Sequence, residues 1–435
     1  MATTDDDFHF LLAAARRLLD EISKEISSRR AEASRGQVLA DHVTHALRAI
    51  AAKVDEAEER YPSHHSNAAK LAGARELRLY THLVWGTHCS LLWLRAEEQV
   101  LLDLGALYFA DELALDLLGS GVEVTPVESS DYMYSTSSWP FDWLGKELGE
   151  ELPDGPRPVV LAFPAHAQHT MLLHCLFAHE LSHPAVDERG LANAALEPLR
   201  ESGAYQTVLD AAGDQTVEEL RPLVEEEGPK LATLWLEELF CDALAFALLG
   251  PAYLFAFAEM GLSVGWSKSD DEHPSMALRT LLLVKFAKRH GWDAYLESRL
   301  PRIWEWLEFA GGGRSTVPAG IGSFAERICR NSDEVILDLA ESAIGERLFA
   351  AAQWEYREAF FAELLDNDVI PAEDEDGVAA KHHEILLASW LQALDKHGGA
   401  PSAIPLAIAE TDYHRFVAKA LEMSTTLRLW AETEI

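Results

Sequence analysis

The sequence predicts a mostly helical α+β protein in which helical regions flank a core that contains a small β-sheet. Helical periodicity, with apolar residues every three or four positions, recurs over long stretches of the 435 residues. Only two short segments read as strands, and two strongly apolar segments, residues 171–183 and 233–246, are best read as buried helices. We expect an N-terminal helical region at 1–118, a core at 119–290 and a C-terminal helical region at 291–435.

The N-terminal region should consist of helices. Two amphipathic helices are predicted between residue 8 and about residue 60, with a break at Gly36. Residues 61–67 are rich in turn formers and predict a loop, and two further helices are expected near 68–98 and 99–118.

Two segments of the core predict the small sheet. Residues 121–127 alternate as a strand does, and residues 158–164 form the best strand pattern in the chain, with Pro164 at its end. A strand bounded by prolines is usually an edge strand, because proline cannot donate to a ladder. An open edge near a reactive site could accept an extended peptide as an added strand, which suggests a peptide substrate.

Composition narrows the classes of partner. The chain has 36 basic and 72 acidic residues, a formal net charge of -36, which repels nucleic acid and anionic lipid surfaces. The uncharged stretch 243–258 is too short for a membrane span and is broken by Gly250-Pro251. Four scattered cysteines predict no disulfide framework, and the acidic N-terminus does not look like an export signal. We therefore expect a cytoplasmic protein with neither nucleic-acid nor membrane partners.

A His-Glu-x-x-His motif, residues 179–183, lies in the first apolar segment. His179 and His183 are four residues apart, so on a helix they can reach one metal ion together. Zinc suits such ligands and lowers the pKa of a bound water to about 7, and Glu180 is placed to take that water's proton. The alternative is a buried helix with two hydrogen-bonded histidines, although burying these groups unpaired would cost several kcal/mol. Pro184 should leave His183 at the very end of the helix.

The second apolar segment supplies candidate acidic ligands. Glu238 and Asp242 lie four residues apart on one helical face. Glu238 can complete the metal ligands, while Asp242 can hydrogen-bond the far nitrogen of a ligating histidine and fix its tautomer. Glu237 points about 100° away from Glu238 and is expected on the surface.

These motifs resemble those of the gluzincin zinc metallopeptidases. HExxH followed by ExxxD, and then His273-Pro274 with Arg279 in an HPxxxxR pattern, is similar to the M48-like branch, as a soluble relative of the Ste24 and HtpX type. The resemblance covers roughly residues 155–290 and implies a zincin-like metallopeptidase core. It also implies that His273 and Arg279 border the cleft, and that His273 could stabilise an oxyanion.

The remaining candidates have plainer interpretations. Cys175 and Cys241 could touch zinc as thiolates, but buried small residues are the commoner explanation. His382-His383-Glu384 lacks a second histidine at metal-binding spacing and is expected to be a solvated helix start.

The predicted function is that of a zinc-dependent metallopeptidase acting on a protein or peptide substrate. Its helical flanks would bind a regulatory partner or restrict access to the site. Two alternatives remain open at this point: a non-catalytic scaffold or sensor of zincin-like shape that binds a protein partner, and a zinc hydrolase of a non-peptide amide.

Overall fold

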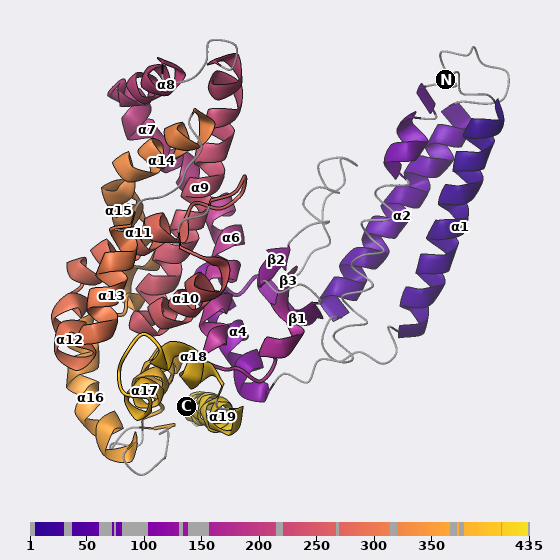
Figure 1. The fold of residues 1–435 in the computed structure, drawn as a ribbon. Helices are drawn as coiled ribbons and strands as arrows, with labels where there is room; N and C mark the ends of the chain where they lie inside the picture. Colours follow the sequence, from indigo (N-terminus) through magenta and orange to yellow (C-terminus); the bar gives the residue numbers. More distant parts are fainter. Residues whose placement is uncertain are drawn as a thin grey trace. The chain divides into compact units, whose positions relative to one another are not determined.

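The computed structural model describes residues 5–29, 37–60, 72–73, 75–80, 103–129, 134–137, 156–214, 221–266, 269–313, 320–365, 372–373, 378–409 and 411–433. Helices dominate these residues (Figure 1). Apart from one isolated bridge between Glu373 and Ala379, their β-structure is a three-stranded sheet. The predicted mostly helical α+β class is confirmed.

The chain divides into two compact units. The first holds Met1–Leu101 and Gly119–Ala165, and the second holds Leu102–Leu118 and His166–Ile435. This division does not follow the three predicted regions, because long-range packing decides it. In the first unit α2 (Gln37–Arg60) packs on strand β3 (Arg157–Pro164), and in the second α4 (Leu104–Leu118) packs on α6 (Phe177–Arg189).

The first unit contains the predicted helical pair, α1 (Asp5–Arg29) and α2, which pack against each other. Their apolar faces share a core with the sheet, in which Ile50 and Val160 are fully or almost fully buried. The predicted loop at 61–67 and most of the predicted helix at 68–98 lie outside the described residues.

The expectation that residues 158–164 form an edge strand is wrong. The strand order is β1-β3-β2, with β1 (Val122–Ser129) parallel and β2 (Ser135–Ser137) antiparallel to β3. The ladder with β2 covers only residues 160–162 of β3, so Pro158 and Pro164 fall outside it and remove no donor from that pairing. Because β3 has a neighbouring strand on each side, it is not an edge strand, so the argument from strand addition at this segment to a peptide substrate loses its premise.

The second unit is a helical assembly. Its helices besides α4 are α6 (Phe177–Arg189), α7 (Leu191–Glu201), α8 (Ala204–Asp214), α9 (Arg221–Leu249), α10 (Pro251–Val264), α11 (Met276–Arg289), α12 (Trp292–Arg299), α13 (Pro301–Gly311), α14 (Ile321–Asn331), α15 (Asp333–Ile344), α16 (Ala351–Leu365), α17 (His382–Lys396), α18 (Ala403–Ile408) and α19 (Thr411–Thr433). The described residues also include the short 3₁₀ helices η1 (Ala165–Ala167), η2 (Leu173–Leu176) and η4 (Gly345–Arg347).

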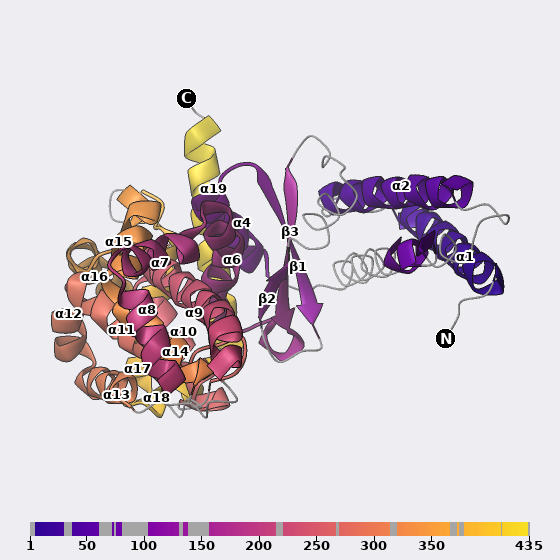
Figure 2. The same ribbon diagram turned by 90° about the horizontal axis from the view of Figure 1, so that it is seen from above.

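Helix α9 is the central element of this unit. Figure 1 and Figure 2 show it among helices that precede and follow it in sequence, and it packs against α6, α11, α14 and α15. Almost every residue from Trp235 to Leu249 is buried, because neighbours cover this half of the helix on all sides. Gly250, with φ 55°, and Pro251, at the first position of α10, end it as the sequence predicts.

Helix α6 corrects the expectation that His183 ends a helix. The helix continues to Arg189 with Pro184 inside it and ends at Gly190, whose φ of 60° is left-handed. Proline at 184 removes only the bond its own N–H would make to the Glu180 carbonyl, and packing of α6 against both α4 and α9 holds the helix together. The two histidines therefore lie inside one continuous helix.

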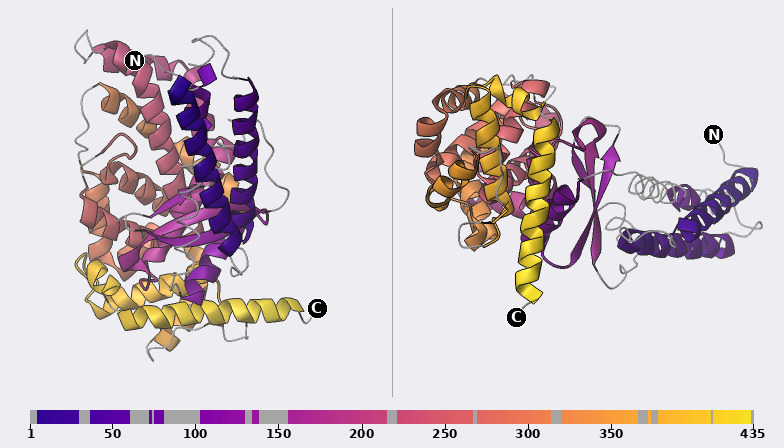
Figure 3. Two further views of the ribbon diagram at one scale, coloured as in Figure 1. Left: turned by 90° about the vertical axis from the view of Figure 1, so that its right-hand side faces the viewer. Right: turned by 90° about the horizontal axis from the view of Figure 1, so that it is seen from below.

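The C-terminal helices pack against the rest of this unit: α17 lies against α10, α16, α18 and α19, and α19 packs along α4 (Figure 3). The expectation of a solvated start for α17 is wrong, since His382 is 1% and Glu384 7% exposed. His382 lies against Glu112 of α4 and Thr425 of α19, which cover it. Among the described residues, no helix combines the length and apolar character needed to cross a membrane.

Candidate metal centre

Three potential ligands converge where α6 packs on α9. His179 and His183 come from α6 and Glu238 from α9, and one donor atom of each lies within 4.8 Å of the other two. His179 Nε2 is 3.3 Å from Glu238 Oε2, and His183 Nε2 is 3.5 Å from Glu238 Oε1. Ligands about 2.0–2.1 Å from a tetrahedral ion lie about 3.3 Å apart. These two spacings are those expected of groups that could hold a metal ion together.

Glu238 has a buried carboxylate oxygen that makes ion-pair contacts but no hydrogen bond within the described residues. The residue is 7% exposed, and its buried Oε2 accepts no hydrogen bond from the described residues. Burial favours the protonated acid, but the Arg279 charge and the contact with His179 hold the pKa of Glu238 well below its usual range. The side chain is thus a buried carboxylate with an oxygen available for coordination.

Asp242 holds the other nitrogen of His179. Its Oδ1 lies 3.0 Å from His179 Nδ1, and the residue is fully buried. Arg279 donates to both Asp242 oxygens at 2.7 Å, and the Tyr253 hydroxyl donates to Oδ1 at 2.6 Å. With its orientation fixed in this way, Asp242 directs Nε2 of His179 toward Glu238 and His183.

These carboxylates also control the proton on His179. Burial alone would favour the neutral ring, but the contacts with Asp242 and Glu238 raise the pKa of His179 to about 10. A metal ion that binds through Nε2 must displace that proton, so binding releases a proton to solvent.

His183 has an acidic neighbour as well, and it corrects the surface position expected for Glu237. Glu237 Oε1 lies 3.2 Å from His183 Nδ1, and the Glu237 side chain is 32% exposed. Glu237 and Glu238 are adjacent on α9, and each contacts a histidine because α6 packs across α9 at this point. The Glu237 side chain is long enough to reach the ring of His183 although it leaves α9 in a different direction from Glu238. Each candidate histidine ligand therefore has a carboxylate beside Nδ1.

His273 lies at the exposed side of the cluster. Its Nε2 is 3.9 Å from Glu238 Oε1, and its side chain is 37% exposed. Asp270 Oδ1 accepts bonds from the backbone N–H groups of Glu272 and His273, at 2.8 and 2.6 Å, and lies 3.1 Å from His273 Nδ1. Asp270 thus holds both the loop and the ring in place.

Arg279 does not border a cleft as the resemblance implies. It is 3% exposed and lies beneath the ligands, where its NH1 is 3.3 Å from Glu238 Oε2 and its guanidinium stacks over the ring of Phe257 at 5.0 Å. Glu180 is in the first turn of α6 and is partly exposed, so it remains accessible from solvent.

The two nearby cysteines are buried thiols. Cys175 and Cys241 are both fully buried and free. Burial raises the pKa of Cys175 to about 12, and burial together with the charges of Glu238 and Glu237 raises the pKa of Cys241 well above its ordinary value. The group of potential metal ligands found among the described residues includes neither cysteine, which favours the interpretation as buried small residues.

Sequence reasoning missed Tyr253 and Asp270. Tyr253 is the only residue with a hydroxyl group in the uncharged stretch 243–258, and a polar group in such a segment needs a partner. Asp270 precedes His273 by three residues, a spacing at which a carboxylate can cap the turn that presents the ring.

Comparison with known proteins gives no relative: no family model, curated protein or solved structure matches the chain. A functional assignment must therefore rest on the residues of this centre.

Proposed function

We propose that this protein is a zinc-dependent hydrolase that cleaves peptide bonds. The observation that carries the proposal is the convergence of His179, His183 and Glu238 within 4.8 Å, with a carboxylate beside Nδ1 of each histidine. In this proposal these three residues hold the ion. Bound zinc would supply a Lewis acid that lowers the pKa of a coordinated water to about 7.

The chain's own groups have distinct tasks in this proposal. Glu180, next to His179 and partly exposed, takes a proton from the attacking water and returns it to the leaving nitrogen. Asp242 and Glu237 fix the tautomers of the two histidines so that Nε2 faces the ion. His273, held by Asp270 at the exposed side, donates from Nε2 in its protonated form to the developing oxyanion.

The choice of peptides as substrates rests on the order of the HExxH, ExxxD and HPxxxxR motifs. With β3 central in its sheet, no strand-addition argument supports it. The buried position of Arg279 fits the same proposal in another way, because its charge stabilises two carboxylates that would otherwise repel each other beneath the ion.

The proposal is tested by comparing Glu180→Gln with Glu188→Gln. Both changes neutralise one acid on α6, but Glu188 is exposed beyond the second histidine. On a library of quenched fluorescent peptides, turnover should fall at least about a hundredfold in Glu180→Gln, as expected for loss of a general base, and should be unchanged in Glu188→Gln. Cleavage that persists in zinc-loaded Glu180→Gln would contradict the proposal.

A further inference from the structure

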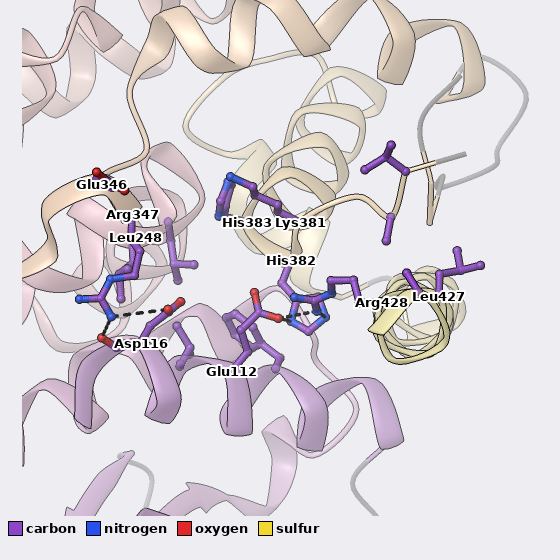
Figure 4. Close-up of a pocket in the computed structure, with 16 residues that line it drawn as sticks. Glu112, Asp116, Leu248, Glu346, Arg347, Lys381, His382, His383, Leu427 and Arg428 are labelled. Atoms are coloured by element: carbon purple, nitrogen blue, oxygen red, sulfur yellow. Dashed lines mark hydrogen bonds and ion pairs between the residues drawn. The ribbon is translucent and has the colours of Figure 1, made fainter. Parts of the chain in front are cut away.

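A cavity of about 640 Å³ lies within the second unit, away from the candidate metal centre. It is enclosed by α4, the end of α9, η4, the start of α17 and α19 (Figure 4). Leu248 lines it and follows Glu238 by ten residues on α9, which places the cavity about 15 Å along that helix from the metal ligands. The volume is within the range of pockets that hold small organic molecules.

Most of the cavity wall is apolar. The apolar side chains come from α4, α9, α19 and the segment before α17, and they are Phe109, Leu113, Leu248, Leu249, Val378, Ala379, Leu427 and Ala431. Such a wall favours a ligand with a hydrocarbon body.

The acids that face the cavity are largely occupied by the protein's own cations. Glu112 Oε2 is 2.5 Å from Arg428 NH2 and 2.9 Å from His382 Nδ1. Burial favours the protonated acid, but His382 and Arg428 hold the pKa of Glu112 at about 2. Glu112 is therefore a carboxylate whose negative charge is balanced by these neighbours. On the opposite side in Figure 4, Arg347 binds the backbone carbonyl of Asp116 and lies 3.6 Å from its carboxylate.

One ring nitrogen of His382 is occupied by hydrogen bonds within the protein. Its Nε2 lies 2.9 Å from both Thr425 Oγ1 and Arg428 NH2. Since a guanidinium can only donate, Nε2 accepts, and the ring proton is on Nδ1 beside Glu112. This Nδ1–H lies 2.9 Å from Glu112 Oε2 but makes no hydrogen bond to the described residues, so it is a further donor beside the cavity.

The other groups on this side of the cavity that can still bind a ligand are cationic. Arg428 Nε is buried and makes no hydrogen bond to the described residues. The Lys381 side chain is exposed at the cavity, and its ammonium makes no ion pair within the described part of the chain. Glu346, the remaining acid, is exposed on the Arg347 side.

We propose that this cavity binds a small amphipathic carboxylate. Its hydrocarbon body packs between α4, α9 and α19, and its carboxylate is bound by Arg428 and Lys381. The site requires both parts: the apolar wall excludes small inorganic anions as good ligands, and the spare cations disfavour a neutral or cationic head group.

The first test is calorimetric titration of the full chain with three probes that share one eight-carbon body: octanoate, octanol and octylammonium. Octanoate should bind at least about tenfold more tightly than either of the others. Equal binding of octanol, or no measurable binding of octanoate, would overturn the proposal.

Two matched pairs of variants locate the site. Ala431→Phe fills the cavity from an exposed position on α19, and its control is Thr426→Phe on the same helix outside the cavity. Lys381→Glu reverses the spare charge, and its control is Lys419→Glu, which faces solvent on α19. Both cavity variants should weaken octanoate binding at least about tenfold and both controls less than about twofold. Unchanged binding in either cavity variant, in a protein with an unaltered circular dichroism spectrum, would show that the ligand binds elsewhere.

Discussion

His179 in the candidate metal centre and His382 in the cavity have the same kinds of neighbour, but they differ in which atoms near them lack a hydrogen bond. Each histidine is buried and lies beside a carboxylate and an arginine: Asp242 and Arg279 for His179, Glu112 and Arg428 for His382. Nε2 of His179 faces a second histidine and an acceptor oxygen of Glu238 that has no hydrogen bond. Nε2 of His382 is already taken by Thr425 and Arg428.

The difference shows that a His-Asp/Glu-Arg cluster alone does not indicate a metal site. The convergence of two histidine nitrogens and a carboxylate distinguishes the first cluster, and N–H groups without a hydrogen bond to the described residues distinguish the second. The first arrangement suits a cation and the second an anion. The following variants test this contrast, from the largest expected effect to the smallest.

Arg279→Met should cost about 3–5 kcal/mol of unfolding free energy, because it leaves the buried carboxylates of Asp242 and Glu238 with only the His179 ring as a buried cation. Arg428→Met should cost only about 1–2 kcal/mol, because Glu112 keeps His382 and is partly open to solvent. Urea unfolding of both variants beside the parent measures the two losses. Similar losses of stability in the two variants would contradict the predicted difference between the two arginines.

Asp242→Asn should weaken zinc binding about a hundredfold and Glu237→Gln about tenfold, since each loses the carboxylate that orients a histidine and Glu237 is the more exposed of the two. Competition with a chromogenic chelator measures the affinities. Glu112→Gln is the matched control from the other cluster and should leave zinc affinity unchanged; a comparable loss there would remove the distinction between the clusters.

A third buried histidine sharpens the contrast through its pH dependence. Burial lowers the pKa of His174 to about 3, although a hydrogen bond with the Gln168 backbone acts in the opposite direction. The pKa of His179, in contrast, is raised to about 10. Below about pH 6.5 the unfolded chain takes up a proton at His174 that the folded chain does not, so stability falls as the pH drops toward 3. At pH 5 this amounts to about 2 kcal/mol.

The measurement compares the parent with His174→Leu in urea at pH 7 and pH 5. The parent should lose about 2 kcal/mol more than the variant over this interval. Equal losses would show that His174 does not titrate as its burial implies.

Tyr253→Phe should have the smallest effect, about 1 kcal/mol in stability and less than about tenfold in zinc affinity. Asp242 loses one donor but keeps two from Arg279. Thermal unfolding with and without zinc measures both quantities. A loss as large as that of Asp242→Asn would mean that Tyr253, rather than Arg279, fixes the carboxylate.

Local periodicity was enough to predict part of this centre. A spacing of four residues places His179 with His183, and Glu238 with Asp242, on one face of each helix wherever the helices lie. The mostly helical class and the break at Gly250-Pro251 follow from patterns of the same short range.

The rest depended on how elements pack. Whether α6 continues through Pro184 depends on its contacts with α4 and α9, and whether β3 is central depends on a three-residue partner strand. Glu237 reaches His183 only because of the way α6 crosses α9, and His382 is buried only because α4 and α19 cover it. These contacts join residues that are far apart in the chain, so a local sequence pattern does not predict them.

The most direct test of the central claim is the metal content of the purified protein after dialysis against zinc and then against metal-free buffer. The parent and Glu180→Gln should each retain about one zinc per chain, and His183→Ala and Glu238→Ala should retain almost none while His382→Ala retains the full amount. Absence of zinc in the folded parent, or full retention in Glu238→Ala, would contradict the assignment of these residues as ligands.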